Sequence, residues 1–211
     1  MYVPPIFAAR DADGLHDFIE AHSFATVVAT GPDGLIASHL PVLLDRDRGP
    51  HGTLTVHLAR PNPQGRTMDG QEVLVIFTGP HGYISPSWYE THPSVPTWNY
   101  AAVHAYGRAR AVTDPAQLKD IVRRLTEQYE SGRDTPWTMA GLPQDYVAGM
   151  LRGIVGFAIE ITRLEGKHKL SQNRNATDRR NVIAALGASA DPDDRALAEY
   201  MARHAPPQSA K

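Results

Sequence analysis

Cysteine is absent from the 211 residues of this sequence. Its absence excludes disulfide bonds, thiolate catalysis, iron–sulfur clusters and zinc sites with cysteine ligands. Any redox chemistry must therefore come from a bound cofactor. A metal site built on histidine is also disfavoured, because the ten histidines include no His-x-x-x-His or similarly compact spacing. We accordingly expect no metal.

Long apolar runs are lacking as well, and none approaches the roughly 20 residues of a membrane-spanning helix. The residues after Met1 show neither the basic nor the apolar region of a secretion signal. These features predict a cytoplasmic protein without membrane contact. The formal net charge of −2 creates no overall field toward nucleic acid or anionic lipid, so any such binding would be local.

The length and the hydrophobic content of 42% suit one substantial core rather than two independent domains. We expect residues 1–165 to form the main domain. Residues 166–211 would add a basic segment and helices packed on the same domain, with a frayed tail after His204.

Six runs of β-branched or alternating residues between turn signals predict strands. They are Phe24–Thr30, Leu35–Leu44, Thr53–Ala59, Val73–Thr78, Ala101–Val112 and Ile154–Thr162. Gly-Pro-x-Gly sequences at Gly31–Gly34, Gly49–Gly52 and Gly79–Gly82 predict tight turns, because proline presets φ and glycine permits φ > 0.

Helical spacing of apolar residues and N-cap signals predict five helices. They begin near Asp11, Asp114, Gln144, Thr177 and Asp191. Strands with helices inserted between and after them, but without regular β-α-β alternation, indicate an α+β fold, mainly β, rather than a Rossmann sheet. A compact barrel with peripheral helices and a C-terminal helical annex fits this order.

The segment from Gly79 to Tyr106 has the most unusual composition, because aromatic residues alternate with hydrogen-bonding ones. A flavin needs an apolar slot for its ring, polar partners for the ring edge, and hydroxyl or amide partners for the ribityl chain. The segment supplies all three. An aromatic barrel core with a proline-rich surface loop explains the same composition equally well.

Particular motifs resemble those of one family, the PaiB-type FMN-binding negative transcriptional regulators. The central block runs from Tyr83-Ile84-Ser85-Pro86-Ser87-Trp88-Tyr89 through Val95-Pro96-Thr97-Trp98-Asn99-Tyr100 to His104 and Gly107. Further matches are Met1–Phe7, His39-Leu40-Pro41, His57–Pro63 and Lys169–Arg174. The resemblance covers residues 1 to about 187, and it implies a split β-barrel that binds FMN, usually as a homodimer with the flavin at or near the subunit interface.

The resemblance also nominates cofactor-binding residues. Ser38, His39, His57 and Ala59 would form one wall that reaches the ribityl chain or the phosphate, and Asn62 would offer its amide. Exposure on a strand explains His57 equally well, and turn formation explains Asn62 equally well. The ring side would be lined by Tyr83, Ser85, Trp88, Trp98 and Asn99, although packing alone also accounts for Trp98.

The FMN phosphate needs cations or clustered donors. Lys169 and Gln172 are our candidates, because they lie in the family motif directly after the last predicted strand. A solvated face before a helix, or a weak contact to a nucleic-acid backbone, is the alternative interpretation of this basic stretch.

The resemblance favours a flavin-dependent regulator or sensor. No helix-turn-helix is evident in the sequence, so DNA binding has little support from the residues themselves. An FMN-dependent oxidoreductase and a haem-handling split barrel stay open as alternatives. No acid–base pair or nucleophile stands out, and catalytic residues cannot be named from the sequence.

Overall fold

A computed structural model describes residues 1–204 of the chain. The chain divides into two compact units. The first unit comprises Met1–Asp11, Thr78–Val103 and the described chain from Glu165, and the second unit comprises Ala12–Phe77 and His104–Leu164. The prediction of a frayed tail after His204 lies outside the described residues.

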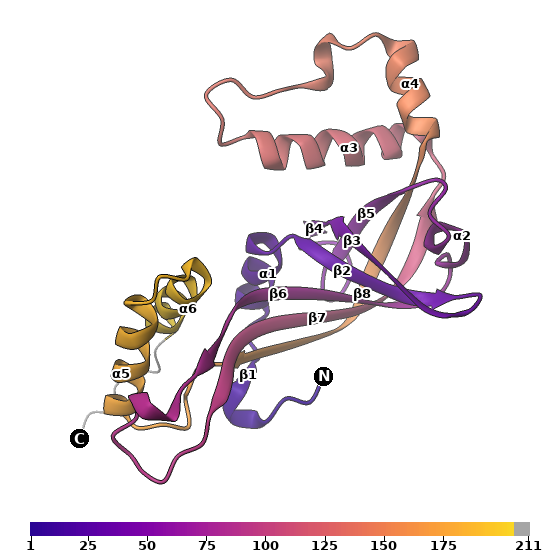
Figure 1. Cartoon of the computed structure of the whole chain (residues 1–211). Coiled ribbons are helices and arrows are strands. Elements are labelled where there is room, and N and C mark those ends of the chain that lie inside the picture. The colour runs from indigo at the N-terminus through magenta and orange to yellow at the C-terminus, as the bar shows by residue number, and fades with distance from the viewer. Residues whose placement is uncertain (205–211) are drawn as a thin grey trace. The chain divides into compact units, whose positions relative to one another are not determined.

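One antiparallel sheet of eight strands forms the frame of the protein (Figure 1). The strands follow each other in the order β3-β2-β6-β7-β8-β5-β4, and β1 pairs with β8, so the sheet is open. Their bounds are β1 Ala8–Ala9, β2 Phe24–Gly31, β3 Gly34–Pro41, β4 Leu43–Asp45, β5 Thr53–Ala59, β6 Glu72–Ile84, β7 Thr97–Val112 and β8 Ile154–Lys169. The mixed α+β class that the sequence predicts is confirmed.

Six helices accompany the sheet in residues 1–204; those capped by Asp114 and Asp191 begin where the sequence predicts, and the one predicted from Thr177 begins slightly earlier, after Asn175. Asp114, Asn175 and Asp191 each accept a hydrogen bond from a backbone N–H of the first turn. The helices are α1 Ala12–Ala21, α2 Gln64–Thr67, α3 Pro115–Glu130, α4 Gln144–Arg152, α5 Ala176–Gly187 and α6 Pro192–Arg203. Short 3-10 turns lie at Pro5–Phe7, Pro86–Trp88 and Met139–Gly141.

The turn predicted at Gly79–Gly82 is wrong, because these residues lie inside strand β6. A Cβ atom built on Gly82 would lie 3.0 Å from the Leu197 side chain and 3.1 Å from that of Asp194, both on α6. The glycine thus permits a close approach of helix to strand rather than a reversal of the chain. The turns at Gly31–Gly34 and Gly49–Gly52 are confirmed.

Strand bounds also differ from the prediction at other places. The predicted strand Leu35–Leu44 is divided into β3 and β4 at Val42, whose backbone N–H donates to the carbonyl of Ser23. The last two strands are longer than predicted, so that Trp98 and Asn99 lie within β7 and Lys169 is the last residue of β8 rather than following it.

Helix α3, which belongs to the second unit, packs its apolar stripe inside that unit. Leu118, Ile121 and Leu125 form a buried cluster with Leu43 of β4. A Cβ on Gly156 would lie 2.9 Å from the Leu118 side chain, so the absence of a side chain on β8 permits this close packing.

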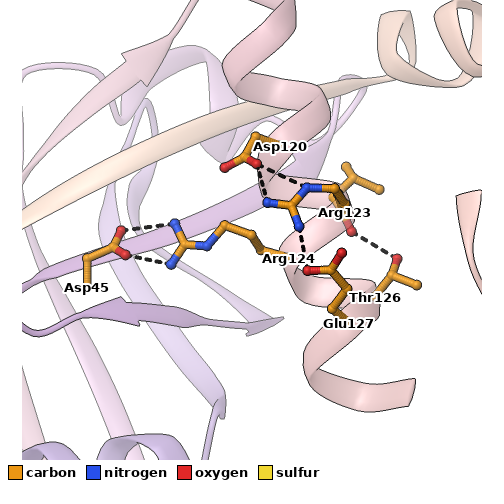
Figure 2. A network of polar contacts seen from close by, with 7 residues as sticks. Asp45, Asp120, Arg123, Arg124, Thr126 and Glu127 are labelled. Carbon is orange, nitrogen blue, oxygen red and sulfur yellow. Dashed lines mark hydrogen bonds and ion pairs between the residues drawn. The ribbon is translucent and has the colours of Figure 1, made fainter. Parts of the chain in front are cut away.

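A bidentate ion pair holds α3 beside β4, as Figure 2 shows. The Arg124 guanidinium donates to Asp45 Oδ1 at 2.5 Å and to Asp45 Oδ2 at 3.2 Å. Both side chains are about one-third exposed, and the pair raises the pKa of Arg124 above its usual range. The pair fixes which face of α3 turns toward the sheet.

No helix within residues 1–204 is long and apolar enough to cross a membrane. The same residues contain no group of three or more histidine, aspartate or glutamate side chains that could hold a metal ion.

Candidate functional site

A cavity of about 330 Å³ lies against His57 in the second unit. Strand β5 places His57 on the face opposite the buried Leu58, so the imidazole turns toward α3 and α4. The rest of the lining is mostly apolar: Val122, Thr126, Trp137, Met139, Leu142, Tyr146, Val147, Met150, Leu151 and Ile154. The cavity has the size and the lining of a slot for a flat ring.

The His57 imidazole itself is unusual, because its Nδ1 atom is buried and finds no hydrogen-bond partner in residues 1–204. Burial also lowers the pKa of His57, so the ring is neutral near pH 7. A buried nitrogen without a partner destabilises the folded chain. A ligand that bonds to it would remove this cost, and the atom is therefore a candidate contact for a ligand.

A further cavity of about 310 Å³ adjoins the first one and shares His57, Val122, Thr126 and Trp137 with it. Pro41, Leu125, Tyr129 and Glu130 complete its lining. The His57 side chain thus lies between two hollows, which extend the apolar slot toward the end of β3.

Ser38 and Asn62, two of the predicted residues, are hydrogen-bonded to each other. Asn62 Nδ2 donates to Ser38 Oγ at 2.9 Å, and Asn62 Oδ1 accepts from the backbone N–H of Gln64 at 3.0 Å. The Asn62 backbone N–H donates to the carbonyl of Ala59. Hydrogen bonds through Asn62 therefore connect Ser38 on β3 and Ala59 at the end of β5 to the polar turn that follows β5.

His39 lies on the opposite face of β3 from Ser38, since neighbouring strand residues alternate. It is exposed, its Nδ1 hydrogen-bonds Thr26 Oγ1 at 3.0 Å, and its ring stacks on Phe24 at a centroid distance of 6.5 Å. The structure does not bring His39 together with Ser38 and Asn62.

In the first unit, Tyr83 and Trp98 form an exposed aromatic pair. Their rings meet edge to face at a centroid distance of 6.0 Å, and the side chains are 47% and 54% exposed. Lys169 Nζ donates to the Trp98 carbonyl at 2.7 Å and also to Thr97 Oγ1. Burial and the nearby Lys167 lower the pKa of Lys169. An anion bound beside Lys169 would stabilise its charged ammonium.

The other predicted residues of the first unit make hydrogen bonds within it, but the buried Oδ1 of Asn99, like Nδ1 of His57, has no hydrogen-bond partner among residues 1–204. Asn99 is fully buried, and its Nδ2 donates to Ser171 Oγ at 2.9 Å. Ser85 accepts from the backbone N–H of Ser87 and so caps the turn that contains the half-buried Trp88. The Gln172 amide accepts from the backbone N–H of Leu170 and donates to the His168 carbonyl.

Sequence reasoning missed the residues that α3, α4 and their connection contribute to the His57 cavity. Trp137, Tyr146 and Met150 line it and are each more than half exposed. One signal was available: Tyr146, Val147, Met150 and Leu151 recur at helical spacing and give α4 a single apolar face.

The residues present fit the demands of a flavin. The apolar cavity beside a buried nitrogen suits a ring with a polar edge, and the hydroxyl and amide groups of Ser38 and Asn62 suit a polyhydroxylated chain. No comparable set of residues for a metal is found between Met1 and His204.

Comparison with known sequences gives a family for this chain. A family model described as "Putative FMN-binding domain" matches residues 1–163. The chain is 41% identical to Protease synthase and sporulation protein PAI 2 of Bacillus subtilis, over 95% of this chain and 96% of that protein. It is also 34% identical to Uncharacterized protein AN0679 of Emericella nidulans, over 71% of this chain and 74% of that one.

Solved structures share the fold at low sequence identity. The FAD and heme binding protein from Mycobacterium smegmatis is 17% identical, with a TM-score of 0.58 over 84% of this chain and 79% of that one. Flavocytochrome Anf3 from Azotobacter vinelandii is 14% identical, with a TM-score of 0.58 over 82% and 75%. The predicted split-barrel fold is confirmed. The chain belongs to the FMN-binding family described as "Putative FMN-binding domain", and FMN is its cofactor.

Proposed function

We propose that the flavin ring of FMN occupies the His57 cavity and that the ribityl chain runs toward Ser38 and Asn62. The observation that carries the proposal is the buried Nδ1 of His57, which has no partner among the described residues and faces an apolar hollow. Together with the family match over residues 1–163, this atom is the best-supported contact for a polar ring edge.

Each side chain has a separate role in this proposal. The neutral His57 imidazole hydrogen-bonds the ring edge and orients it, and Trp137 and Tyr146 cover the ring and exclude water. Bound flavin supplies reversible electron transfer. The Ser38 hydroxyl, held by Asn62, orients the chain that carries the phosphate.

In the first unit, Lys169 is a candidate contact for an anion, because its ammonium retains one N–H besides the two that donate to Thr97 and Trp98. Gln172 would act indirectly, because both atoms of its amide already hold the turn after β8.

We further propose a homodimer, as the family resemblance implies. Phe24 and Leu35, exposed to 69% and 82%, lie on one face of the β2–β3 pair, and Leu74 and Ile76 of β6 extend that face. These apolar side chains are only partly covered within the described chain. A second copy would cover them and the edge strand β3.

The role that these features favour is a flavin-dependent regulator or sensor, supported by the 41% identity to a sporulation protein over 95% of the chain. A gel-shift assay at moderate salt tests direct DNA binding, which we expect to be weak. Tight, sequence-specific binding by the isolated protein would show that the chain reads DNA itself.

The cofactor proposal is tested by titrating FMN into flavin-free protein and following the heat and the flavin absorbance. We expect one FMN per chain, with Trp137 fluorescence quenched on binding. No heat of binding to a folded sample, or binding that His57→Phe leaves unchanged, would refute the assigned site.

A further inference from the structure

A cavity of about 760 Å³ in the second unit lies between α3, the connection from residue 131 to residue 143, and α4. Figure 1 shows the two helices and this long connection as one arm of the chain. Ala116, Lys119, Arg123 and Glu127 recur every three or four residues, so one face of α3 lines the cavity. Its volume falls in the range of small-molecule sites.

The opposite side of the cavity is mostly apolar. Helix α4 contributes Val147, Ala148 and Leu151 at helical spacing, and the connection contributes Trp137 and Leu142 among others. The occupant must therefore present an apolar body to α4 and the connection.

Charge on the α3 side is almost fully compensated. Figure 2 shows the Arg123 guanidinium between the carboxylates of Asp120 and Glu127, and each ion pair has an N–O distance of 2.5 Å. Lys119 is different, because it makes no hydrogen bond or ion pair with any residue that the structure describes. Among the described residues, the exposed Lys119 is thus the cation in the cavity lining that has no acidic partner.

A single cation selects the chemistry of the anion. A phosphate dianion is bound by several cations or clustered N–H donors, which this cavity lacks among its described lining residues. A carboxylate carries one charge and needs one such partner. The apolar wall then accommodates an aromatic ring or a short alkyl chain.

We propose that this cavity binds a small amphipathic monocarboxylate, with its carboxylate on Lys119 and its apolar body against Trp137, Val147 and Leu151. The cavity shares six side chains with the His57 cavity: Thr126, Trp137, Met139, Leu142, Val147 and Leu151. The bound monocarboxylate would therefore lie beside the flavin. Only this proximity to the flavin rests on the proposed FMN site; the binding of the carboxylate does not.

The test is calorimetric titration of 4-phenylbutyrate into the full chain, once flavin-free and once saturated with FMN. We expect saturable binding in both samples. Lys119→Met should weaken it about fivefold, as expected for one partly solvated ion pair. The uncharged 4-phenylbutyramide should bind wild type and Lys119→Met equally. Arg66→Met, which removes an exposed cation from α2 outside this cavity, is the matched control and should change nothing.

A second variant tests the apolar wall. Ala148 is exposed and lines this cavity but not the His57 cavity. Ala148→Phe should therefore fill the space, abolish 4-phenylbutyrate binding and leave FMN affinity unchanged. The proposal is overturned if 4-phenylbutyrate does not bind, or if Lys119→Met and Ala148→Phe bind it as wild type does. A protein that binds 4-phenylbutyrate in this way but not FMN would retain this proposal and lose only the flavin site.

Discussion

His57→Phe should stabilise the flavin-free protein while weakening its cofactor binding. The wild-type ring buries an Nδ1 atom that has no hydrogen-bond partner among the residues described. Such an atom costs about 1–3 kcal/mol, and a phenyl ring of similar shape avoids that cost. Allowing for imperfect packing, we expect a gain of about 1 kcal/mol in the free energy of unfolding. The loss of one hydrogen bond should raise the Kd for FMN about tenfold.

The stability gain should depend on pH. Because burial lowers the pKa of His57, the unfolded chain binds a proton at this residue more readily than the folded chain does. Below the unfolded pKa of about 6.5, wild-type stability therefore falls as the pH falls toward the folded-state pKa. The phenylalanine variant lacks this loss, so its advantage should grow between pH 6.5 and pH 5.

Urea denaturation of flavin-free samples at pH 7.5 and pH 5.5, with FMN calorimetry on the same preparations, measures both effects. His51→Phe is the matched control, because His51 is exposed and outside the cavity. It should change stability by less than about 0.5 kcal/mol and leave the FMN affinity intact. A His57→Phe protein that is less stable than wild type at both pH values and binds FMN normally would refute the reasoning.

Three further results are expected. Asp45→Asn should lower the free energy of unfolding by about 1–2 kcal/mol, because it breaks a partly buried bidentate ion pair. Asp120→Asn breaks a half-exposed ion pair and should lower it by less than about 0.5 kcal/mol. Equal losses of the two variants in urea denaturation would contradict this difference. Leu35→Glu should shift the protein toward monomer in sedimentation with an unchanged circular dichroism spectrum; a dimer that persists would exclude the β2–β3 face. Asn62→Ala should cost about 1–2 kcal/mol in thermal unfolding through two lost hydrogen bonds, and a melting temperature equal to wild type would show that the turn after β5 is not held by this amide.

Features set by neighbouring residues were predictable from the sequence. Asp114 and Asp191 cap their helices because a carboxylate at this position reaches N–H groups only two residues away. The turn at Gly31–Gly34 needs only its own residues for the reversal of the chain. In such places the local chemistry alone decides the conformation.

Features set by distant residues were not predictable. Gly82 reads as part of a turn, but it lies in β6 under α6, whose contacting residues follow more than 110 positions later. The alternation of apolar and polar residues in β5 predicts that His57 and Leu58 lie on opposite faces of the strand. The cavity that His57 meets is built from α3 and α4, and no periodicity within β5 indicates them.

The family motifs nominated some residues of the candidate site, but not their arrangement. The family motifs nominated Ser38 and Asn62, and the two prove to be hydrogen-bonded partners. They also nominated His39, whose side chain the strand alternation turns to the other face of β3. Motif membership carries no information on which of two adjacent side chains faces a ligand.

Three of the four boundaries between the two compact units of the chain fall inside strands. They lie between Phe77 and Thr78 in β6, between Val103 and His104 in β7, and between Leu164 and Glu165 in β8, and the fourth lies between Asp11 and Ala12 before α1. Truncation would therefore sever three strands of the sheet instead of releasing an autonomous fragment. Fragments of this chain are unsuitable for mapping its activity, and single substitutions in the full-length protein are the way to assign function to either unit.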